Sequence, residues 1–306
     1  MSRAVVFAYH DVGARCLRTL LARSVDVALV VTHRDNPAEG AWFESVAAVA
    51  DEHDLPAITP EDPNCDEVVA RVKAARPEFV FSFYYRLILG PSLLGAPTRG
   101  ALNVHGSLLP KYRGRAPVNW AVIRGERETG ATLHYMVDKP DAGDLVDQQA
   151  VPILPDDRAI DVMRKVTVAA ELVLHRSLPG LIAGTAPRRP QDLAAGFYLG
   201  GRKPADGAID WSAGAQAVHN LVRGVAPPYP GAFATIAGRP ARILRTVLTD
   251  RRGTFGAPTL FVEQGRCFVQ CADRRILRIL ELEIDDRSSR EVAFEGLLPQ
   301  DPVALS

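Results

Sequence analysis

The chain has 306 residues, and its 36 Lys and Arg residues balance 36 Asp and Glu residues, so the formal net charge is zero. With 47% hydrophobic and 24% charged residues, it is long and apolar enough for one large domain or two ordinary ones, which excludes collagen-like, coiled-coil and disordered classes. A neutral chain has no overall field that attracts polyanions, so we do not expect a non-specific binder of nucleic acid or anionic lipid.

The N-terminal segment and the cysteines indicate the compartment. The first apolar run is short and is interrupted by His10 and Asp11, which is typical of neither a signal peptide nor a membrane span. The four cysteines, scattered over a long chain, fit reduced thiols rather than a disulfide framework. Cys267 and Cys271 are four residues apart with no His nearby, which favours packing over zinc binding. We therefore expect a cytoplasmic protein.

Short apolar strands alternate with helical patterns through the first half of the chain. This alternation predicts an open, mostly parallel α/β sheet with right-handed crossovers. In chain order the predicted elements are strand Ala4–Ala8, helix Asp11–Ala22, strand Val25–Thr32, helix Trp42–His53, helix Glu67–Ala75, strand Phe79–Tyr84, strand Ala101–Val104 and helix Pro117–Arg124.

The next elements complete this sheet and lead into a second domain. Strands Ala131–Val137 and Asp144–Ile153 predict an edge hairpin, and Asp156–Ala183 predicts a long helix that opens on acidic residues. A stretch rich in Pro, Gly and Arg follows, so we place the domains at residues 1–203 and 204–306. The second domain is predicted as a small barrel-like β domain. Its expected elements are helix Ala213–Val222 and strands Ala232–Ile236, Ala241–Leu248, Thr259–Val262, Cys267–Cys271 and Ile276–Ile284.

Several common enzyme motifs are absent from the sequence. The first strand-to-helix turn has a single glycine, Gly13, where a dinucleotide fingerprint needs GxGxxG, which disfavours a nicotinamide-dependent dehydrogenase. The sequence contains no Walker A motif, GxSxG elbow or HExxH motif, so phosphoryl transfer on a P-loop, α/β-hydrolase chemistry and zinc proteolysis lose their usual markers.

Two polar residues follow a predicted strand and are candidates for catalysis. Asn103 and His105 are two residues apart, so on an extended chain both side chains point to the same face. In open α/β sheets ligands bind beyond the carboxyl ends of strands, where these residues would lie. An Asn amide donates to an oxyanion and a His exchanges protons near neutral pH, which together fit acyl transfer. The alternative is that Asn103 ends a strand and His105 satisfies a turn carbonyl.

Asp141 is the candidate third member of this set. It lies in the polar turn of the predicted hairpin, and a carboxylate near His105 would orient the imidazole and favour its protonated form. The spacing does not show that the two side chains meet. Together with Asp138 and Asp144, Asp141 equally fits a solvated turn.

Three cations stand close together in the loop after the Asn103 strand. Lys111, Arg113 and Arg115 fit a clamp for a phosphate or carboxylate, to which an Arg binds in a bidentate manner. They fit a solvated loop equally well.

These motifs resemble the folate-dependent formyltransferases, a family that includes methionyl-tRNA formyltransferase and nucleotide-sugar N-formyltransferases. The resemblance rests on Asn103-x-His105, on SLLPKYRG at residues 107–114 and on DAGD at residues 141–144. Within the family, FAYHDVG, THRDNP, FSFYYR and HGSLLPKYRGRAPVNW are similar to the formyltransferase part of bifunctional polymyxin-resistance proteins, which formylates UDP-4-amino-4-deoxy-L-arabinose. The resemblance covers essentially the whole chain and is strongest from residue 4 to residue 143.

The resemblance implies a fold, a formyl donor and a set of site residues. The fold is a Rossmann-like, mostly parallel α/β domain followed by an OB-like β-barrel domain, and the donor is the co-substrate 10-formyltetrahydrofolate, with no metal. Asn103 would stabilise the tetrahedral oxyanion, His105 would exchange protons, and Asp141 would favour protonated His105. The residues that would contact the folate are Leu87, Ile88, Leu89, Arg115, Val137, Asp138, Lys139 and Pro140.

The implied reaction is formyl transfer to the 4-amine of UDP-4-amino-4-deoxy-L-arabinose, a step of lipid A modification in polymyxin resistance. The bifunctional proteins also carry a decarboxylating dehydrogenase domain, so we expect that upstream reaction to come from a separate polypeptide. Nucleic acid and membrane are not expected partners.

Two alternatives stay open at this point. Another acceptor, such as a different amino-sugar nucleotide or methionyl-tRNA, would keep the chemistry; tRNA would require an electropositive surface, whereas residues 207–306 hold 12 Arg against 11 Asp and Glu. A non-catalytic folate-binding module would have no need of an oxyanion stabiliser beside a proton shuttle.

Overall fold

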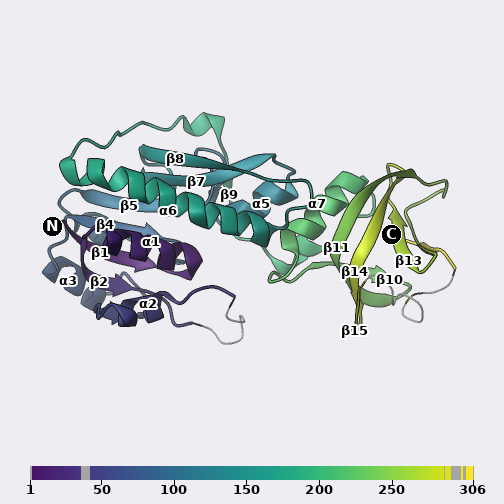
Figure 1. The fold of residues 1–306 in the computed structure, drawn as a ribbon, viewed down its shortest axis with the longest axis horizontal. Helices are drawn as coiled ribbons and strands as arrows, with labels where there is room; N and C mark the ends of the chain where they lie inside the picture. Colours follow the sequence, from purple (N-terminus) through teal and green to yellow (C-terminus); the bar gives the residue numbers. More distant parts are fainter. Residues whose placement is uncertain (1, 36–41, 286, 291–297, 299–300, 306) are drawn as a thin grey trace. The chain divides into compact units, whose positions relative to one another are not determined.

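The structure is a computed structural model that describes residues 2–35, 42–285, 287–290, 298 and 301–305. Contacts between Cα atoms divide the chain into two compact units, which are drawn in Figure 1. The first unit comprises Met1–Pro117, Thr129–Val151 and Arg164–Leu199, and the second comprises Val118–Glu128, Pro152–Met163 and Gly200–Ser306. A domain boundary at residues 203 and 204 stays a prediction.

The first unit is built on a seven-stranded sheet in the order β3-β2-β1-β4-β5-β7-β8. The strands from β3 to β5 pair in parallel, whereas β7 runs antiparallel to β5. Because the chain passes from the β1-β2-β3 side of the sheet to β4 on the other side of β1, the strand order reverses between β1 and β4. The strands are β1 (Arg3–Ala8), β2 (Asp26–Val31), β3 (Ala57–Ile58), β4 (Phe79–Phe83), β5 (Gly100–His105), β7 (Glu128–Tyr135) and β8 (Leu145–Pro152).

Helices cover both faces of this sheet. Alternate residues of each buried strand point to opposite faces, and the apolar cluster on one face joins Val5 and Phe7 of β1 to Val68 and Val72 of α3. On the other face, α1 and α6 lie side by side, where Arg15 pairs with Glu171 at 2.7 Å. In chain order the helices up to Ala183 are α1 (His10–Ala22), α2 (Val46–Glu52), α3 (Asp66–Ala74), α4 (Pro91–Leu94), α5 (Pro117–Ile123) and α6 (Ala159–Ala183), of which α5 belongs almost entirely to the second unit.

The long helix α6 is apolar for a structural reason. Within the described residues it is the one helix long and apolar enough to cross a membrane by length and composition, and half of its most apolar window is buried. The buried residues recur at helical spacing, which is how a core helix covers a sheet. Among them are Val166, Ala169, Ala170, Val173, Leu174, Leu178 and Leu181.

One predicted helix is wrong at its start. The helix expected from Trp42 begins at Val46, because Ser45 is extended and its side chain accepts a hydrogen bond from the Ala48 N–H at 3.3 Å. Trp42 and Phe43 instead pack their rings against His10, with ring centroids 4.5 and 4.6 Å away. These two aromatic side chains are therefore part of an aromatic cluster and not of the inner face of a helix.

The second unit holds helix α7 and a curled antiparallel sheet in the order β10-β11-β14-β13-β12-β16, with β15 also paired to β14 (Figure 1). Its core joins Val218 and Val222 of α7 to Ile243 and Leu277 of the sheet. The elements are α7 (Ala215–Val225), β10 (Ala232–Ile236), β11 (Arg239–Arg252), β12 (Thr259–Glu263), β13 (Arg266–Gln270), β14 (Arg275–Ile284), β15 (Arg287–Arg290) and β16 (Val303–Ala304).

The predicted fold class is confirmed: a mixed sheet dominated by parallel pairs comes first, and a curled half-barrel follows. The sequence analysis did not predict four two-residue strands, which are too short to show a period: β3, β6 (Arg113–Gly114), β9 (Tyr198–Leu199) and β16. Of these, β6 and β9 form a small parallel pair of their own in the first unit.

The cysteines give a test of this packing. Cys16, Cys267 and Cys271 are buried, and burial raises the pKa of the Cys267 and Cys271 thiols to about 12, whereas Cys65 is exposed. Because the thiolate is the reactive form, we expect one thiol per native chain to react within minutes with a disulfide reagent at pH 8, and all four in denaturant. The Cys65→Ser variant removes the fast thiol; two fast thiols in the native protein would contradict the packing.

Candidate active site

Strands β5 and β7 place the candidate residues opposite one another. In the antiparallel register Asn103 faces His134 and His105 faces Thr132. Directly opposite residues of an antiparallel pair project to the same face with Cβ atoms about 5 Å apart. The two-residue spacing predicted to bring Asn103 and His105 to one face is thus matched on the neighbouring strand by Thr132 and His134.

Asp141 reaches this cluster from the loop after β7. Its Oδ1 lies 3.5 Å from Nδ1 of His105 and 3.6 Å from Nε2 of His134, and its Oδ2 accepts the Gly114 N–H at 2.8 Å. The residue adopts a left-handed backbone conformation, with φ of 54°. Such a conformation is uncommon for a residue with a Cβ and marks a position fixed by its surroundings. The structure therefore brings together the two side chains whose meeting the spacing left open.

The environment of Asp141 keeps its carboxyl ionised. Burial of the group raises its pKa, but the charge of His105 and the hydrogen bond from the Gly114 N–H outweigh burial, so the pKa of Asp141 lies well below its usual range. A buried carboxylate that is met by several donors and positive charges is the stable form at neutral pH. The site thus holds a fixed negative charge beside two imidazole rings.

The ring of His105 is held by the main chain on its other side. Its Nε2 lies 2.8 Å from the Tyr112 carbonyl oxygen, which only accepts, so Nε2 carries a proton and donates. The nitrogen that faces Asp141 is therefore Nδ1. With Nε2 engaged, Nδ1 is the ring atom left to take up and release a proton.

Thr132 anchors the loop that carries this carbonyl. The Thr132 hydroxyl donates to the Ser107 carbonyl oxygen at 2.6 Å and accepts from the Leu109 N–H at 3.2 Å. The Ser107 hydroxyl in turn donates to the Lys111 carbonyl oxygen at 2.7 Å. These bonds fix the SLLPKYRG segment against β7, and through it the Tyr112 carbonyl that orients His105.

The loop of Asp141 is anchored by Gln191. Its Nε2 donates to the carbonyl oxygens of Asp141 at 3.1 Å and of Gly143 at 2.6 Å. A side-chain amide that binds two carbonyls of one loop fixes the loop's shape. Gln191 lies outside every motif of the sequence analysis, and no periodic signal would have found it.

Apart from Arg115, which follows β6, the residues predicted to contact folate lie on two loops. Leu89 is buried in the apolar cluster that also receives Met136, the residue before the second loop, so the two loops share a packed base. Above this base stand large exposed apolar side chains: Leu87 at 41% exposure, Ile88 at 69% and Val137 at 47%. The remaining predicted contacts, which are exposed polar or loop residues, are Arg115, Asp138, Lys139 and Pro140.

The three cations of the loop after β5 do not form one group. Arg113 is buried, and its guanidinium donates to the Leu193 carbonyl oxygen at 3.2 Å. Lys111 and Arg115 are exposed. Of the three, Arg113 therefore belongs to the scaffold that holds the loop, and only Lys111 and Arg115 offer their charge to a ligand.

The sequence analysis did not identify an aromatic cluster that lies where the strand order of the sheet reverses, between β1 and β4. His10 follows β1 and Tyr84 follows β4, and both residues have positive φ, of 66° and 57°. The His10 ring packs with Trp42 and Phe43 and lies 6.2 Å from the Tyr84 ring. A Cβ atom on Gly106 would meet the Tyr84 hydroxyl, so this glycine lets the Tyr84 ring come close to the residue after His105.

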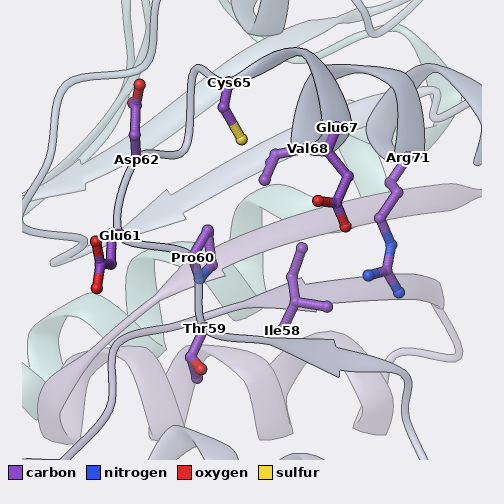
Figure 2. Close-up of a pocket in the computed structure, with 9 residues that line it drawn as sticks. All are labelled: Ile58, Thr59, Pro60, Glu61, Asp62, Cys65, Glu67, Val68 and Arg71. Carbon is purple, nitrogen blue, oxygen red and sulfur yellow. The ribbon is translucent and has the colours of Figure 1, made fainter.

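A cavity of about 400 Å³ lies elsewhere in the first unit, between β3 and the start of α3 (Figure 2). Glu61, Asp62 and Glu67 line it together with Arg71. None of the catalytic candidates lines it. Three strands separate β3 from β5 in the sheet, so we do not assign this acidic cavity to the site.

Comparison with known proteins identifies the family of this architecture. A profile described as formyl transferase matches residues 3–178, and one described as formyl transferase, C-terminal domain, matches residues 202–293. The fold is similar to an N-formyltransferase from Helicobacter canadensis in complex with folinic acid and dTDP-3-aminofucose (TM-score 0.71, 18% identity, covering 91% of this chain and 99% of that one).

Two further solved structures show the same likeness. The sugar 3N-formyl transferase WlaRD, crystallised in the presence of dTDP and 5-N-formyl-THF, has a TM-score of 0.69 and 17% identity over 94% of this chain and 99% of that one. A sugar N-formyltransferase from Shewanella sp FDAARGOS_354 has a TM-score of 0.61 and 19% identity over 78% of this chain and 94% of that one. At these identities the structural likeness concerns the fold.

Gly114 provides a test of the loop geometry. Its φ is 103°, and a Cβ atom there would lie 2.0 Å from the Leu199 carbonyl oxygen, so Gly114→Ala would break the β6–β9 contact and move the N–H that binds Asp141. We expect the free energy of unfolding to fall by about 2 kcal/mol or more in urea titrations. Gly200→Ala, where a Cβ meets nothing within 4 Å, is the matched control and should change it by less than about 0.5 kcal/mol.

The lowered pKa of Asp141 predicts a pH-dependent stability. A carboxyl whose pKa is lower in the folded state stabilises that state above the unfolded pKa of about 3.9, and the contribution is lost as the pH falls towards the folded pKa. Asp141→Asn should therefore lower the free energy of unfolding by about 2 kcal/mol at pH 5.5, with a smaller difference at pH 3.5. Urea titrations of both proteins measure this; a difference independent of pH would contradict it.

Proposed function

Because the chain belongs to the formyl transferase family, we propose that it transfers the formyl group of 10-formyltetrahydrofolate to the amine of an amino-sugar nucleotide. The observation that carries the proposal is the cluster of Asn103, His105 and Asp141 at the end of β5. It combines an amide donor, an imidazole and an ionised carboxylate, which are the groups that acyl transfer to an amine requires.

The chemistry follows from the position of these groups. The donor supplies an electrophilic formyl carbon, which the neutral amine attacks as the C=O π pair moves to oxygen. Asn103 donates an N–H to that oxygen. The amine proton passes to Nδ1 of His105, whose positive charge Asp141 balances at 3.5 Å. As the carbonyl re-forms, the bond between the formyl carbon and N10 of the folate breaks, and His105 returns a proton to N10.

The exposed apolar side chains supply a surface for the folate. Large apolar residues standing clear of the core on neighbouring loops are typical of a ligand-binding surface. Leu87, Ile88 and Val137 fit the flat ring system, and Leu89 holds the base of the first loop. Arg115 and Lys139 provide exposed cations for the carboxylates of the folate tail. The main chain of Asp138 and Pro140 completes the contacts expected from the sequence.

The acceptor that we propose is UDP-4-amino-4-deoxy-L-arabinose, with formylation at the 4-amine. The support is the sequence similarity of four segments to enzymes with this substrate, among them the FAYHDVG segment that carries His10. On this proposal the product serves lipid A modification, the enzyme acts in the cytoplasm, and a separate decarboxylating dehydrogenase supplies the precursor of the amino sugar.

A thymidine-linked amino sugar is the second candidate acceptor. The Helicobacter canadensis protein was crystallised with dTDP-3-aminofucose and WlaRD with dTDP, and both share the fold of this chain. Methionyl-tRNA is less favoured, because residues 207–306 hold 12 Arg against 11 Asp and Glu, which is too balanced a charge to bind a large polyanion.

Formyl transfer with purified protein tests the function. We expect turnover of UDP-4-amino-4-deoxy-L-arabinose, a fall in kcat of about 100-fold or more in Asn103→Ala through loss of an oxyanion donor, and a similar fall in His105→Ala. Asp51→Asn, which removes an exposed carboxylate on α2, is the control for the proton-transfer set and should keep kcat within about threefold.

The acceptors run in parallel decide between the alternatives. Turnover of only a thymidine-linked sugar or of initiator tRNA would keep the chemistry and overturn the acceptor. Folate binding without transfer to any acceptor would favour a non-catalytic folate-binding module.

A further inference from the structure

His134 is a buried imidazole beside the catalytic candidates that the proposed reaction does not use. It lies on β7 directly opposite Asn103, and its side chain is almost completely enclosed, with the residue 1% exposed. In the sequence it lies within a mostly apolar predicted strand, where nothing distinguishes it from a residue of the core. A buried ring with two polar nitrogens must find a partner for each, and the identity of those partners reveals its role.

The two nitrogens of His134 have different partners. Nδ1 lies 2.8 Å from the Tyr135 carbonyl oxygen, which only accepts, so Nδ1 carries the proton. Nε2 lies 3.0 Å from Nδ2 of Asn103. In the neutral ring with its proton on Nδ1, Nε2 presents a lone pair, and the Asn103 amide donates one of its two N–H groups to it.

We propose that His134 is a positioning residue that fixes the orientation of the Asn103 amide for oxyanion stabilisation; this inference rests on the proposed function. The oxygen and nitrogen ends of a side-chain amide have nearly the same size and shape, so packing alone does not choose between them. The lone pair of His134 accepts from nitrogen and repels oxygen. It therefore holds Nδ2 on the His134 side and leaves the second N–H to donate to the developing oxyanion.

The carboxylate of Asp141 lies close to both rings. Its Oδ1 faces two ring nitrogens, Nδ1 of His105 at 3.5 Å and Nε2 of His134 at 3.6 Å. A proton on Nε2 of His134 would remove the acceptor for Asn103 and force the amide to turn its oxygen inward. The proton that Nδ1 of His105 takes up in the proposed reaction lies beside Asp141 and leaves the bond between Asn103 and His134 intact.

Two substitutions of His134 distinguish the role of Nε2 as a hydrogen-bond acceptor from the role of the ring in packing. His134→Phe keeps the ring shape and removes both nitrogens, whereas His134→Gln places an amide oxygen near the position of Nε2, where it can still accept from Asn103. We expect kcat to fall by about 10-fold or more in the Phe variant, less than the loss of a whole oxyanion donor. The KM values should change by less than about threefold, and the Gln variant should keep kcat within about fivefold. Equal losses in both variants would overturn the proposal.

A double-mutant cycle tests whether His134 acts through Asn103. In the Asn103→Ala background there is no amide to orient, so adding His134→Phe should lower kcat by less than about twofold further. The same 10-fold fall in both backgrounds would show that His134 acts on something else, such as the fold. Far-ultraviolet circular dichroism and urea titration of each variant establish that the compared proteins are folded.

The tautomer of His134 gives a readout that does not depend on activity. In a long-range ¹H–¹⁵N spectrum of the protein labelled at histidine, the signal absent from His134→Gln should be that of a neutral ring protonated on Nδ1, at the pH of the assay. A ring protonated on Nε2, or on both nitrogens, would overturn the inference whatever the enzyme turns over. Absence of wild-type turnover with every acceptor would overturn the proposed function instead, so the two failures are distinguishable.

Discussion

The buried carboxylate of Asp141 is the constraint on which the site depends. An ionised carboxylate in a protein interior must be met by donors or by positive charge, because its desolvation is otherwise too costly. Here the Gly114 N–H and the ring of His105 supply that compensation. His134 of β7 lies 3.6 Å away, so this charge stands where residues of β5, β6 and β7 come together. The left-handed backbone of Asp141, held through Gln191, is the local cost of reaching them.

The same arrangement explains how much the sequence predicted. The strands of the first sheet are short and apolar, so their positions follow from composition, and the face shared by Asn103 and His105 follows from the period of a strand. The approach of Asp141 does not follow from any period, since it depends on a positive φ and on a distant glutamine. The sequence analysis missed His134 because a residue within a mostly apolar strand is ordinarily a core residue. Its pairing with Asn103 becomes known only from the register of β5 against β7.

Glycine takes part in this geometry where the main chain comes closest. At Gly114 the backbone has a φ of 103° and lies against Leu199, and its N–H is the only main-chain donor recorded for Asp141 in the described part of the chain. At Gly106 the absence of a Cβ lets the Tyr84 hydroxyl approach. Close packing therefore accounts for these glycines of the family motif. Gly114 leaves room for a neighbouring carbonyl group, and Gly106 leaves room for an aromatic side chain.

The two histidines of the site show how the main chain gives chemically identical side chains different roles. In His105 the Tyr112 carbonyl engages Nε2, so Nδ1 faces the carboxylate and takes part in proton exchange. In His134 the Tyr135 carbonyl engages Nδ1, so Nε2 accepts from Asn103. Which nitrogen carries the fixed proton is decided by which one meets a carbonyl oxygen. One ring is thereby left to move a proton beside Asp141, while the other holds the Asn103 amide in place.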